Sequence, residues 1–384
     1  MTMEYFTLFF LGLVITGGLS PVLMALANKF NLHDVPSERK IHKHPVPVLG
    51  GIAVYFGFVI PVAMALPVGP KLMSIILGGT LLGIVGLIDD LGGLSSIVRL
   101  LAQFAAASMV IMSGIKVSFL PHTLIGDACA YLITAFWIIG IINALNFFDG
   151  MDGVAGGICS VAAGFFFILT CKLGQANVAM PAIALAGASL GFLVFNFRPA
   201  KIYLGDSGST FMGFLLACFA LYGEWSARGP VIALGIPVLI LGILIFDMCY
   251  ITVSRIRRGV VTNFREWLDY TGKDHFHHRL VSAGFTVPQA AVFIYVTCTI
   301  LGLSALLLEK AQSPYLIIIS LLQAVLILAA NSMIMLMGKK IAVGYHGIDE
   351  GNEDELFNRM LEMVSAMKKG KEDRVRSKKS RWIK

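Results

Sequence analysis

Long apolar runs separated by short polar segments dominate the hydrophobic pattern of this chain. Such runs can cross a bilayer when they reach about 17 to 25 residues. They are continuous and do not alternate between apolar and polar residues, which favours helices, because backbone groups in lipid must be satisfied within their own segment. The predicted fold class is therefore all-α, a polytopic integral membrane protein with about eleven transmembrane helices. The candidate spans, of which 208–222 is the shortest, are 5–27, 50–67, 72–88, 99–115, 129–145, 155–172, 178–195, 208–222, 231–254, 288–308 and 314–337.

The composition agrees with a membrane protein. Of the 384 residues, 57% are hydrophobic and 14% are charged, whereas soluble domains average roughly 25% charged residues. The first run begins Met-Thr-Met-Glu without a basic flank or a small-residue cleavage site, so we expect a retained span and not a signal peptide. The six cysteines lie in the spans without a Cys-x-x-Cys pair, which favours small apolar fillers over disulfides or a zinc site.

The distribution of Lys and Arg predicts the orientation. We thread the spans with the N-terminus outside and the C-terminus cytoplasmic. Most of the Lys and Arg residues then lie on or next to the inner side, as the positive-inside rule requires. The net charge of +7 then belongs mostly to a cytoplasmic face and tail, and it gives no evidence for nucleic-acid binding. The outer side receives only five of the 30 Lys and Arg residues, which are Lys71, Lys116, Lys172, Arg228 and Lys310.

The same threading places every polar patch on the cytoplasmic side. These patches are the loops 28–49, 196–207 and 255–287, and the span ends at 89–90 and 146–152. The outer loops are short and almost without features. We therefore expect the working surface of the protein to face the cytoplasm.

Aspartates lie at the edge of apolar runs or inside them. A carboxylate close to hydrocarbon is costly and therefore usually functional. Asp89 and Asp90, at the end of the third run, can hold magnesium or take up a proton, and a solvated helix end is the alternative. Asp247 lies inside the ninth run, and we leave open whether it bonds to a neighbouring helix or belongs to the site. The six residues are Asp89, Asp90, Asp149, Asp152, Asp206 and Asp247.

A run of polar residues at three-residue spacing follows the fifth span, and this spacing lines one face of a helix or a tight turn. The oxygens and amides of Asn143, Asn146, Asp149 and Asp152 suit magnesium and phosphate. Nearby glycines at 150, 153, 156 and 157 allow a ligand to approach the backbone closely, and a glycine-rich face for helix packing is the alternative.

The stretch Gly205-Asp206-Ser-Gly-Ser precedes the eighth span. It offers a carboxylate together with helix N-terminal amides, which favour anions. An ordinary N-cap is the alternative interpretation.

Two basic stretches complement the acids. The segment 34–47 contains Arg39, Lys40 and His42 among prolines, and it suits phosphate capture at the membrane surface or plain anchoring to the inner side. The segment 274–279 contains three histidines and an arginine. Zinc would need further Cys or His ligands nearby, whereas His and Arg together suit a diphosphate.

Carboxylates, amides and basic groups gathered at the mouth of a bilayer imply a reaction between an anionic soluble molecule and a lipid. Magnesium with phosphates is the natural common element. A Walker-type lysine loop does not occur in the sequence, so ATP is not an obvious substrate. The residues alone thus predict magnesium-assisted phosphoryl chemistry on a lipid.

The order of these motifs resembles the polyprenyl-phosphate N-acetylhexosamine-1-phosphate transferase family. This family includes initiating enzymes of enterobacterial common antigen, O-antigen and wall teichoic acid, and the phospho-MurNAc-pentapeptide translocase. Arg99 stands where the family often has Lys, which keeps the charge but changes the geometry. The matching patterns are DxPxxRKxHxxPxPxxGG at 34–51, GxxDD at 86–90, NxxNxxDGxDG at 143–153, GDSGS at 205–209 and HxHHR at 275–279.

The resemblance implies transfer of N-acetylhexosamine 1-phosphate, with GlcNAc-1-phosphate favoured, from a UDP-sugar to undecaprenyl phosphate with release of UMP. We expect residues 1–340 to form a transmembrane catalytic domain with cytoplasmic active-site loops in the plasma membrane, and 341–384 to form a charged cytoplasmic tail. The expected partners are a UDP-N-acetylhexosamine, undecaprenyl phosphate and the lipid bilayer, without nucleic acid, and a homodimer is left open.

The resemblance also implies roles for individual residues. Asp206 and Asn146 would contact Mg²⁺, with Mn²⁺ as a substitute. The catalytic candidates are Asp89 and Asp90, beside the acceptor phosphate, and Asp149 and Asp152, which would shape the nucleotide or metal pocket. His277, His278 and Arg279 would hold the phosphates of the sugar nucleotide. The full set of substrate-binding candidates is Arg39, Lys40, His42, Arg99, Asn143, His275, His277, His278 and Arg279.

Two alternative functions are kept. The peptidoglycan translocase is the nearer one, but the loop 274–285 lacks the proline-led triple-histidine run associated with it, which favours a simple UDP-N-acetylhexosamine donor. A secondary transporter places its acids near the bilayer midplane and often has repeated halves, whereas the acids here crowd one interface. The basic end of the tail, from Lys368 on, suits the anionic inner leaflet, with a disordered solubilising tail as the alternative.

Overall fold

The computed structural model describes residues 2–34, 45–117, 119–121, 123–225, 229–261, 272 and 274–344. Within these ranges the protein is a bundle of helices with one minimal antiparallel ladder, β1 (His33–Asp34) and β2 (Val46–Pro47), in which His33 lies opposite Pro47. The helices are α1 (Thr2–Phe30), α2 (Gly50–Ala65), α3 (Pro70–Gly92), α4 (Ser96–Met112), α5 (Leu124–Phe148), α6 (Val154–Lys172), α7 (Ala176–Asn196), α8 (Gly205–Tyr222), α9 (Pro230–Ile240), α10 (Gly242–Arg257), α12 (Phe276–Ser282), α13 (Val287–Lys310) and α14 (Pro314–Gly344).

Every predicted span coincides with a helix, or with the pair α9 and α10 in the case of 231–254. Seven helices in the described part of the chain are long and apolar enough to cross a membrane, and the count reaches eight if α9 and α10 form one span. Helices α2 and α4 are shorter, and the first turn of α8 is polar. The all-α polytopic membrane fold is thus confirmed, whereas the number of eleven spans and the orientation stay predictions.

The ninth predicted run is broken, which its apolar pattern did not indicate. Helices α9 and α10 meet at Leu241 with a bend of 82°. Pro237 lies one turn before the break, and a proline inside a helix removes a hydrogen bond and crowds the preceding turn. Because of this bend, α10 leaves the direction of α9 and carries the chain toward α12.

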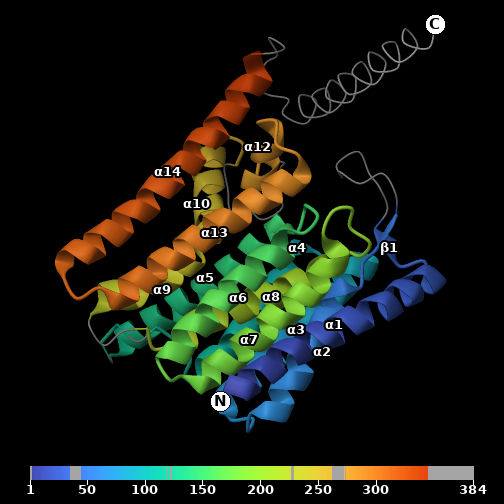
Figure 1. The fold of residues 1–384 in the computed structure, drawn as a ribbon, viewed down its shortest axis with the longest axis horizontal. Helices are drawn as coiled ribbons and strands as arrows, with labels where there is room; N and C mark the ends of the chain where they lie inside the picture. Colours follow the sequence, from blue (N-terminus) through green and yellow to red (C-terminus); the bar gives the residue numbers. More distant parts are fainter. Residues whose placement is uncertain are drawn as a thin grey trace, which may run out of the picture.

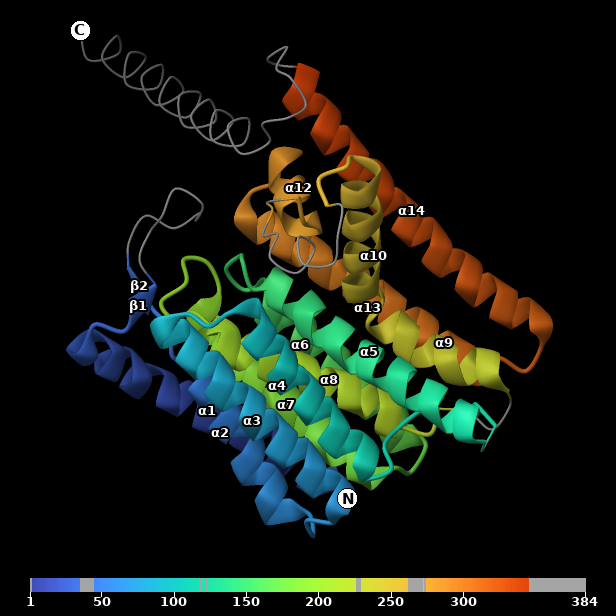
Figure 2. The same cartoon turned by 180° about the vertical axis from the view of Figure 1, so that it is seen from behind.

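Helix α8 lies at the centre of the bundle. Its residues from Ser207 to Ala220 are almost all buried, because α3 and α5 pack along it and α2, α6 and α7 also contact it. Helices α1 and α2 lie at one edge of the molecule and α14 at the opposite edge (Figures 1 and 2). A central helix with buried faces on all sides fixes the position of its own first turn, where Asp206 lies.

Two glycines allow the backbones around that first turn to approach closely. A Cβ atom at Gly86 of α3 would lie 2.5 Å from the backbone nitrogen of Ser207. A Cβ atom at Gly51, at the start of α2, would lie 2.4 Å from the backbone nitrogen of Gly208. Real side chains do not tolerate such distances, so glycine is required at both positions. Glycines of two sequence motifs therefore allow α2 and α3 to approach the start of α8 at one point.

The segment before α2 is tied to the segment before α8 by backbone hydrogen bonds. Gly50 and Gly51 donate to the carbonyls of Tyr203 and Leu204, both at 2.9 Å, and Tyr203 donates to Pro47 at 2.8 Å. We call this end of the bundle, where α3 and α5 finish and α8 begins, the site end. The tail was predicted to span 341–384; its first four residues form the end of α14, and the part from residue 345 on lies outside the described residues.

Candidate active site

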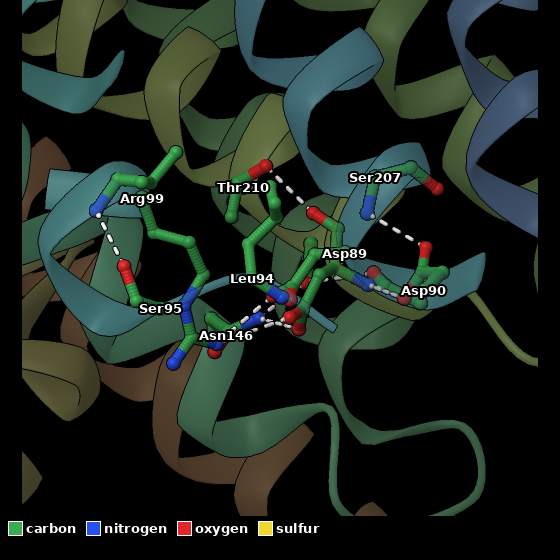
Figure 3. Close-up of polar contacts among 12 residues, drawn as sticks. Asp89, Asp90, Leu94, Ser95, Arg99, Asn146, Ser207 and Thr210 are labelled. Carbon is green, nitrogen blue, oxygen red and sulfur yellow. Dashed lines mark hydrogen bonds and ion pairs between the residues drawn. The ribbon is translucent and has the colours of Figure 1, made fainter. Parts of the chain in front are cut away.

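The first turn of α8 is held by the carboxylate of Asp90. One oxygen of Asp90 accepts from the backbone N–H of Asp206 at 2.8 Å, and the other accepts from the N–H of Ser207 at 3.1 Å (Figure 3). The first N–H groups of a helix have no acceptor within the helix, and they attract negative charge. The anion-binding amides expected at this helix start are therefore occupied by an acid of the protein itself.

Asp89, the neighbour of Asp90 in sequence, faces a different group. Arg99 of α4 places Nη1 at 3.1 Å from Asp89 and at 3.3 Å from Asp206, so one guanidinium bridges two carboxylates (Figure 3). Asp89 also accepts from the backbone N–H of Leu94. Its side chain is only 7% exposed, whereas those of Asp206 and Arg99 are 30% and 38% exposed. Two acids share one cation, and the side of this group that solvent reaches consists of Asp206 and Arg99.

Asn146 joins α5 to the same cluster. Its Nδ2 donates to Oδ1 of Asp206 at 2.7 Å and to Oγ of Ser209 at 2.8 Å. Ser209 in turn donates to the carbonyl of Gly205. The amide nitrogen is thereby committed to α8, which leaves the amide oxygen of Asn146 as the atom that can bind a cation.

Asp149 adds a further acid next to this group. It caps the C-terminus of α5 and accepts a hydrogen bond from the backbone N–H of Gly205. Loss of hydration raises the pKa of Asp149 well above its usual range, and the negative charges of Asp206 and Asp90 add to the effect. Several carboxyl groups thus surround the single guanidinium of Arg99, an arrangement that a bound cation would stabilise in its ionised form.

The donor set fits magnesium better than zinc. In the described part of the chain, His, Cys, Asp and Glu residues do not gather in groups of three or more that could hold a metal ion. Magnesium is usually bound by one or two carboxylates, with water and substrate phosphates completing its shell, whereas zinc sites need three or four protein ligands. Asp206 with the amide oxygen of Asn146, beside Asp89, is a set of this incomplete, all-oxygen type.

Two residues of the predicted polar face do not point into the cluster. Asn143 exchanges hydrogen bonds with Gln103 of α4, at 2.8 and 3.3 Å, and donates to a carbonyl of its own helix. Asp152 accepts from the N–H of Ala200 at 3.2 Å and lies 3.8 Å from Arg198. Asn143 therefore links two helices, and Asp152 braces the connection between α7 and α8.

Asp247, which the sequence left open, holds the start of α12. It is fully buried, and its oxygens accept from His275 Nδ1 at 2.8 Å and from the backbone N–H of Phe276 at 2.7 Å. His275 also stacks on Phe147 of α5, with ring centroids 4.6 Å apart. One aspartate in α10 thus fixes the helix that carries the histidine motif.

The ring of His277, in the same helix, lies close to Gly150, the residue after Asp149. It is fully buried, and neither ring nitrogen has a hydrogen-bond partner among the described residues. A Cβ atom at Gly150 would lie 3.4 Å from its Nε2, and the ring of His278 is 4.2 Å away. Burial lowers the pKa of His277 well below its usual range, with help from His278 and His275, so the imidazole is neutral. Unpaired buried nitrogens are costly, which marks His277 as a ligand-binding candidate.

Arg279 does not lie beside His277, because two residues along a helix correspond to opposite faces. It lines a separate cavity between α10, α12 and α14.

The glycines that follow Asp149 in the sequence have different surroundings. Gly150 faces His277, but Gly157 packs on the ring of Tyr295, and the carbonyl of Gly153 accepts from the hydroxyl of Tyr295 at 2.6 Å. Helix packing thus explains Gly153 and Gly157.

A buried ion pair next to α12 was missed in the sequence. Asp274 accepts from Arg255 at 2.6 and 3.0 Å and from Arg258 at 3.1 Å. Burial alone would raise the pKa of Asp274, but the hydrogen bonds and charge of Arg255 hold it below its usual range. The sequence prediction treated the arginines at the end of α10 only as charge that flanks the membrane.

The substrate-binding candidates Arg39, Lys40 and His42 lie outside the described residues.

Comparison with known proteins gives one family and a set of named relatives. The sequence profile of glycosyl transferase family 4 matches residues 72–224, the part of the chain that carries Asp89, Asn146 and Asp206. Curated relatives match over most of their own length, as three examples show.

The probable undecaprenyl-phosphate N-acetylglucosaminyl 1-phosphate transferase of Bacillus subtilis (strain 168) is 30% identical, over 76% of this chain and 82% of the relative. The decaprenyl-phosphate N-acetylglucosaminephosphotransferase of Mycolicibacterium smegmatis is 32% identical, over 73% and 76%. The undecaprenyl-phosphate alpha-N-acetylglucosaminyl 1-phosphate transferase of Salmonella typhimurium is 31% identical, over 72% and 76%.

Proposed function

The chain belongs to glycosyl transferase family 4, and we propose that it transfers N-acetylglucosamine 1-phosphate from UDP-N-acetylglucosamine to undecaprenyl phosphate. The family expected from the motif order is thereby confirmed. The names of the relatives support the sugar phosphate and a polyprenyl acceptor. The observation that carries the proposal is the cluster of Asp89, Arg99, Asn146 and Asp206 at one end of a bundle of apolar helices. A lipid phosphate and a soluble nucleotide can meet at such a place.

The proposed reaction exchanges one phosphoanhydride link for another. An oxygen of the acceptor phosphate bonds to the sugar-linked phosphorus of the donor. The bond between that phosphorus and the bridging oxygen breaks, and UMP leaves with the electron pair. The products are undecaprenyl-diphosphate-N-acetylglucosamine and UMP, and no atom is oxidised or reduced.

Magnesium is the proposed cofactor, with manganese as a substitute. Asp206 and the amide oxygen of Asn146 are the atoms that would hold it. When bound, the ion supplies neutralisation of the phosphate charge in the transition state. The two carboxyl groups that share Arg99 and the all-oxygen donor set support this assignment.

The two adjacent aspartates have different proposed roles. Asp90 uses both oxygens on the amides of α8, so we assign it to positioning Asp206. We place the acceptor phosphate beside Asp89 and Arg99. In this arrangement Arg99 attracts the phosphate, and Asp89 orients Arg99. The second pKa of a phosphate monoester is about 6, so the acceptor is mostly dianionic at neutral pH. Orientation and charge then matter more than removal of a proton.

The donor is proposed to lie between the acids and α12. Neutral His277 can donate a hydrogen bond to a diphosphate oxygen through one of its unpaired nitrogens. Gly150 leaves the space in front of that ring free of a side chain. Asp149, at the end of α5, forms the wall between this space and the cluster.

The site end is proposed to face the cytoplasm from the plasma membrane. Its residues include Arg99 in the first turn of α4 and, at the end of α10, Arg255, Arg257 and Arg258. The opposite end carries Lys116, paired with Asp127, and Lys172, paired with Glu309. An excess of arginine at one end supports the positive-inside orientation. The product would initiate a cell-envelope glycopolymer, for which teichoic acid and O-antigen are the candidates.

A donor screen tests this function. Purified protein receives undecaprenyl phosphate, magnesium and each UDP-sugar in turn, and release of UMP is followed. We expect release with UDP-N-acetylglucosamine. Release only with UDP-MurNAc-pentapeptide would replace this function by the translocase reaction, and movement of a substrate across vesicles without UMP would favour a transporter.

A further inference from the structure

Tyr295 of α13 reaches the loop 149–153, which connects α5 to α6. Its hydroxyl donates a hydrogen bond to the carbonyl of Gly153 at 2.6 Å, although 142 positions separate the two residues in the sequence. Its ring lies against the backbone of α6, where a Cβ atom at Gly157 would be 2.1 Å from the ring carbons. Tyr295 belongs to none of the sequence motifs, so the bond ties the loop to a helix outside the acid cluster.

The loop is fixed at Gly153 through both polar groups of that residue. Gly153 has a φ of 81°, a conformation that favours glycine. Its N–H donates to Oδ1 of the buried Asn196 at 2.9 Å. Its carbonyl accepts from Tyr295 and also from the N–H of Gly157 at 3.0 Å. Side chains from α7 and α13 thus hold the end of the loop, and the hydroxyl of Tyr295 can be removed without changing the shape of the ring.

Helix α13 also supports α12. Phe293 packs against Phe276, the first residue of α12, with ring centroids 6.2 Å apart. Phe293 and Tyr295 lie on roughly opposite faces of α13, because two residues along a helix correspond to about 200°. One face of α13 therefore contacts the helix that carries His277, and the other contacts the loop that carries Gly150. The packing of α13 against α6, α12 and α14 agrees with this arrangement (Figure 1).

We propose that Tyr295 is a positioning residue for the donor, whose hydroxyl holds the loop 149–153 so that the backbone of Gly150 stays opposite His277. A Cβ atom at Gly150 would lie 3.4 Å from Nε2 of His277, so a small movement of the loop changes the space between them. This inference rests on the proposed function, which places the diphosphate of the donor beside His277. The contacts of Asn146 and Asp90 with α8 hold the acid cluster separately.

Tyr295→Phe tests the proposal, because it removes only the hydroxyl group. The carbonyl of Gly153 keeps its hydrogen bond from Gly157, so the variant should fold. We expect the KM for UDP-N-acetylglucosamine to rise roughly fivefold, the ratio that corresponds to one neutral hydrogen bond of about 1 kcal/mol. The kcat and the KM for undecaprenyl phosphate should stay near the wild-type values. A loss of stability alone would reduce the amount of folded protein and leave the KM for the donor unchanged.

Hydrogen exchange gives a second readout that requires no substrate. The purified full-length protein is transferred to deuterated water, and mass spectrometry follows the peptides that cover the loop 149–153 and the first turn of α6. Backbone amides exchange faster where the structure opens more often, so Tyr295→Phe should accelerate exchange in this segment.

Tyr55→Phe is the matched control for both measurements. It removes a hydroxyl that pairs with Thr80 at 2.8 Å, between α2 and α3. The chemical change is the same, but the lost contact is not at the loop. Exchange in the loop and the KM for the donor should therefore stay at the wild-type values.

The outcomes separate the proposal from the function on which it rests. Unchanged exchange in the loop of Tyr295→Phe would overturn the proposal, and so would faster exchange with an unchanged KM for the donor. An equal rise in the KM for undecaprenyl phosphate would show a general loosening and would also contradict it. Failure of the wild type to release UMP from UDP-N-acetylglucosamine would contradict the proposed function instead, and exchange alone would then decide whether Tyr295 holds the loop.

Discussion

At the scale of single residues, Asp89 and Asp90 show how two identical neighbours acquire different functions. Their side chains leave a helix about 100° apart, so one faces the first turn of α8 and the other faces Arg99. The acid that caps α8 is expected to contribute to stability, and the acid beside Arg99 to turnover.

We predict that Asp90→Asn lowers the free energy of unfolding by about 2 kcal/mol, because the amide cannot accept from two N–H groups in place of the carboxylate. Asp89→Asn should reduce turnover and lower the thermal unfolding midpoint less than Asp90→Asn does. Both quantities are measured on the purified protein. Asp127→Asn is the matched control, since it removes an exposed ion pair at the other end. Equal midpoints for the two variants would contradict the division of roles.

The proposed metal ligands give a second prediction at this scale. Asp206→Asn and Asn146→Ala should each lower turnover by roughly a hundredfold or more, the effect of losing transition-state charge stabilisation, while the protein still inserts. Turnover is measured over a magnesium titration. A variant with the wild-type rate at low magnesium would rule out its residue as a ligand.

At the scale of elements, α12 depends on charges that its own sequence does not contain. Asp247 accepts from the first backbone N–H of α12, and Asp274, just before α12, pairs with Arg255 of α10. Because Arg255 and Asp274 are both buried, the loss of one partner leaves an uncompensated charge.

We expect Asp274→Leu to destabilise the protein by roughly 3 kcal/mol, and the double variant Asp274→Leu with Arg255→Met to recover part of this loss. The unfolding midpoint in detergent measures both. Lys172→Met, which breaks an ion pair open to solvent at the opposite end, should change the midpoint little. A single Asp274→Leu variant as stable as the wild type would show that the ion pair does not hold α12.

The elements also show what the sequence can and cannot predict. Long apolar runs locate α1, α3, α5 and α7 well, because backbone groups in lipid leave few alternatives to a helix. The apolar run continues without interruption through the break between α9 and α10, so the hydrophobic pattern does not predict the break, and Pro237 is the one residue that indicates it. The separation of His277 from Arg279 could not be predicted either, since it depends on the seven-residue helix α12, which is too short to show a period.

At the scale of the whole molecule, the central expectation from the sequence was that distant polar motifs share one side. The contacts among Asp90, Asn146 and Asp206, from three helices, bring these motifs together at the site end. Threading could predict this grouping because each span reverses the direction of the chain. It could not predict which acids cap helices and which remain open, because that depends on approaches of backbone at Gly51 and Gly86.

The orientation of the molecule gives a prediction that one helix can test. Gly69 precedes α3 and Gly92 is its last residue, and a Cβ atom at either position meets open space. In a cysteine-free background, Gly92→Cys should react only with reagents that enter the cytoplasm, and Gly69→Cys should react from outside. The opposite pattern would contradict a cytoplasmic site.

The most direct test of the account follows the phosphate itself. UDP-N-acetylglucosamine labelled with ³²P at the sugar-linked phosphate is given to the purified protein with undecaprenyl phosphate and magnesium, and lipid and nucleotide are separated. Transfer of the sugar phosphate predicts that the label appears in the lipid, that unlabelled UMP is released in equal amount, and that both disappear with Asp206→Asn. Label that remains in the nucleotide as UDP while the sugar moves to the lipid would contradict the proposed reaction.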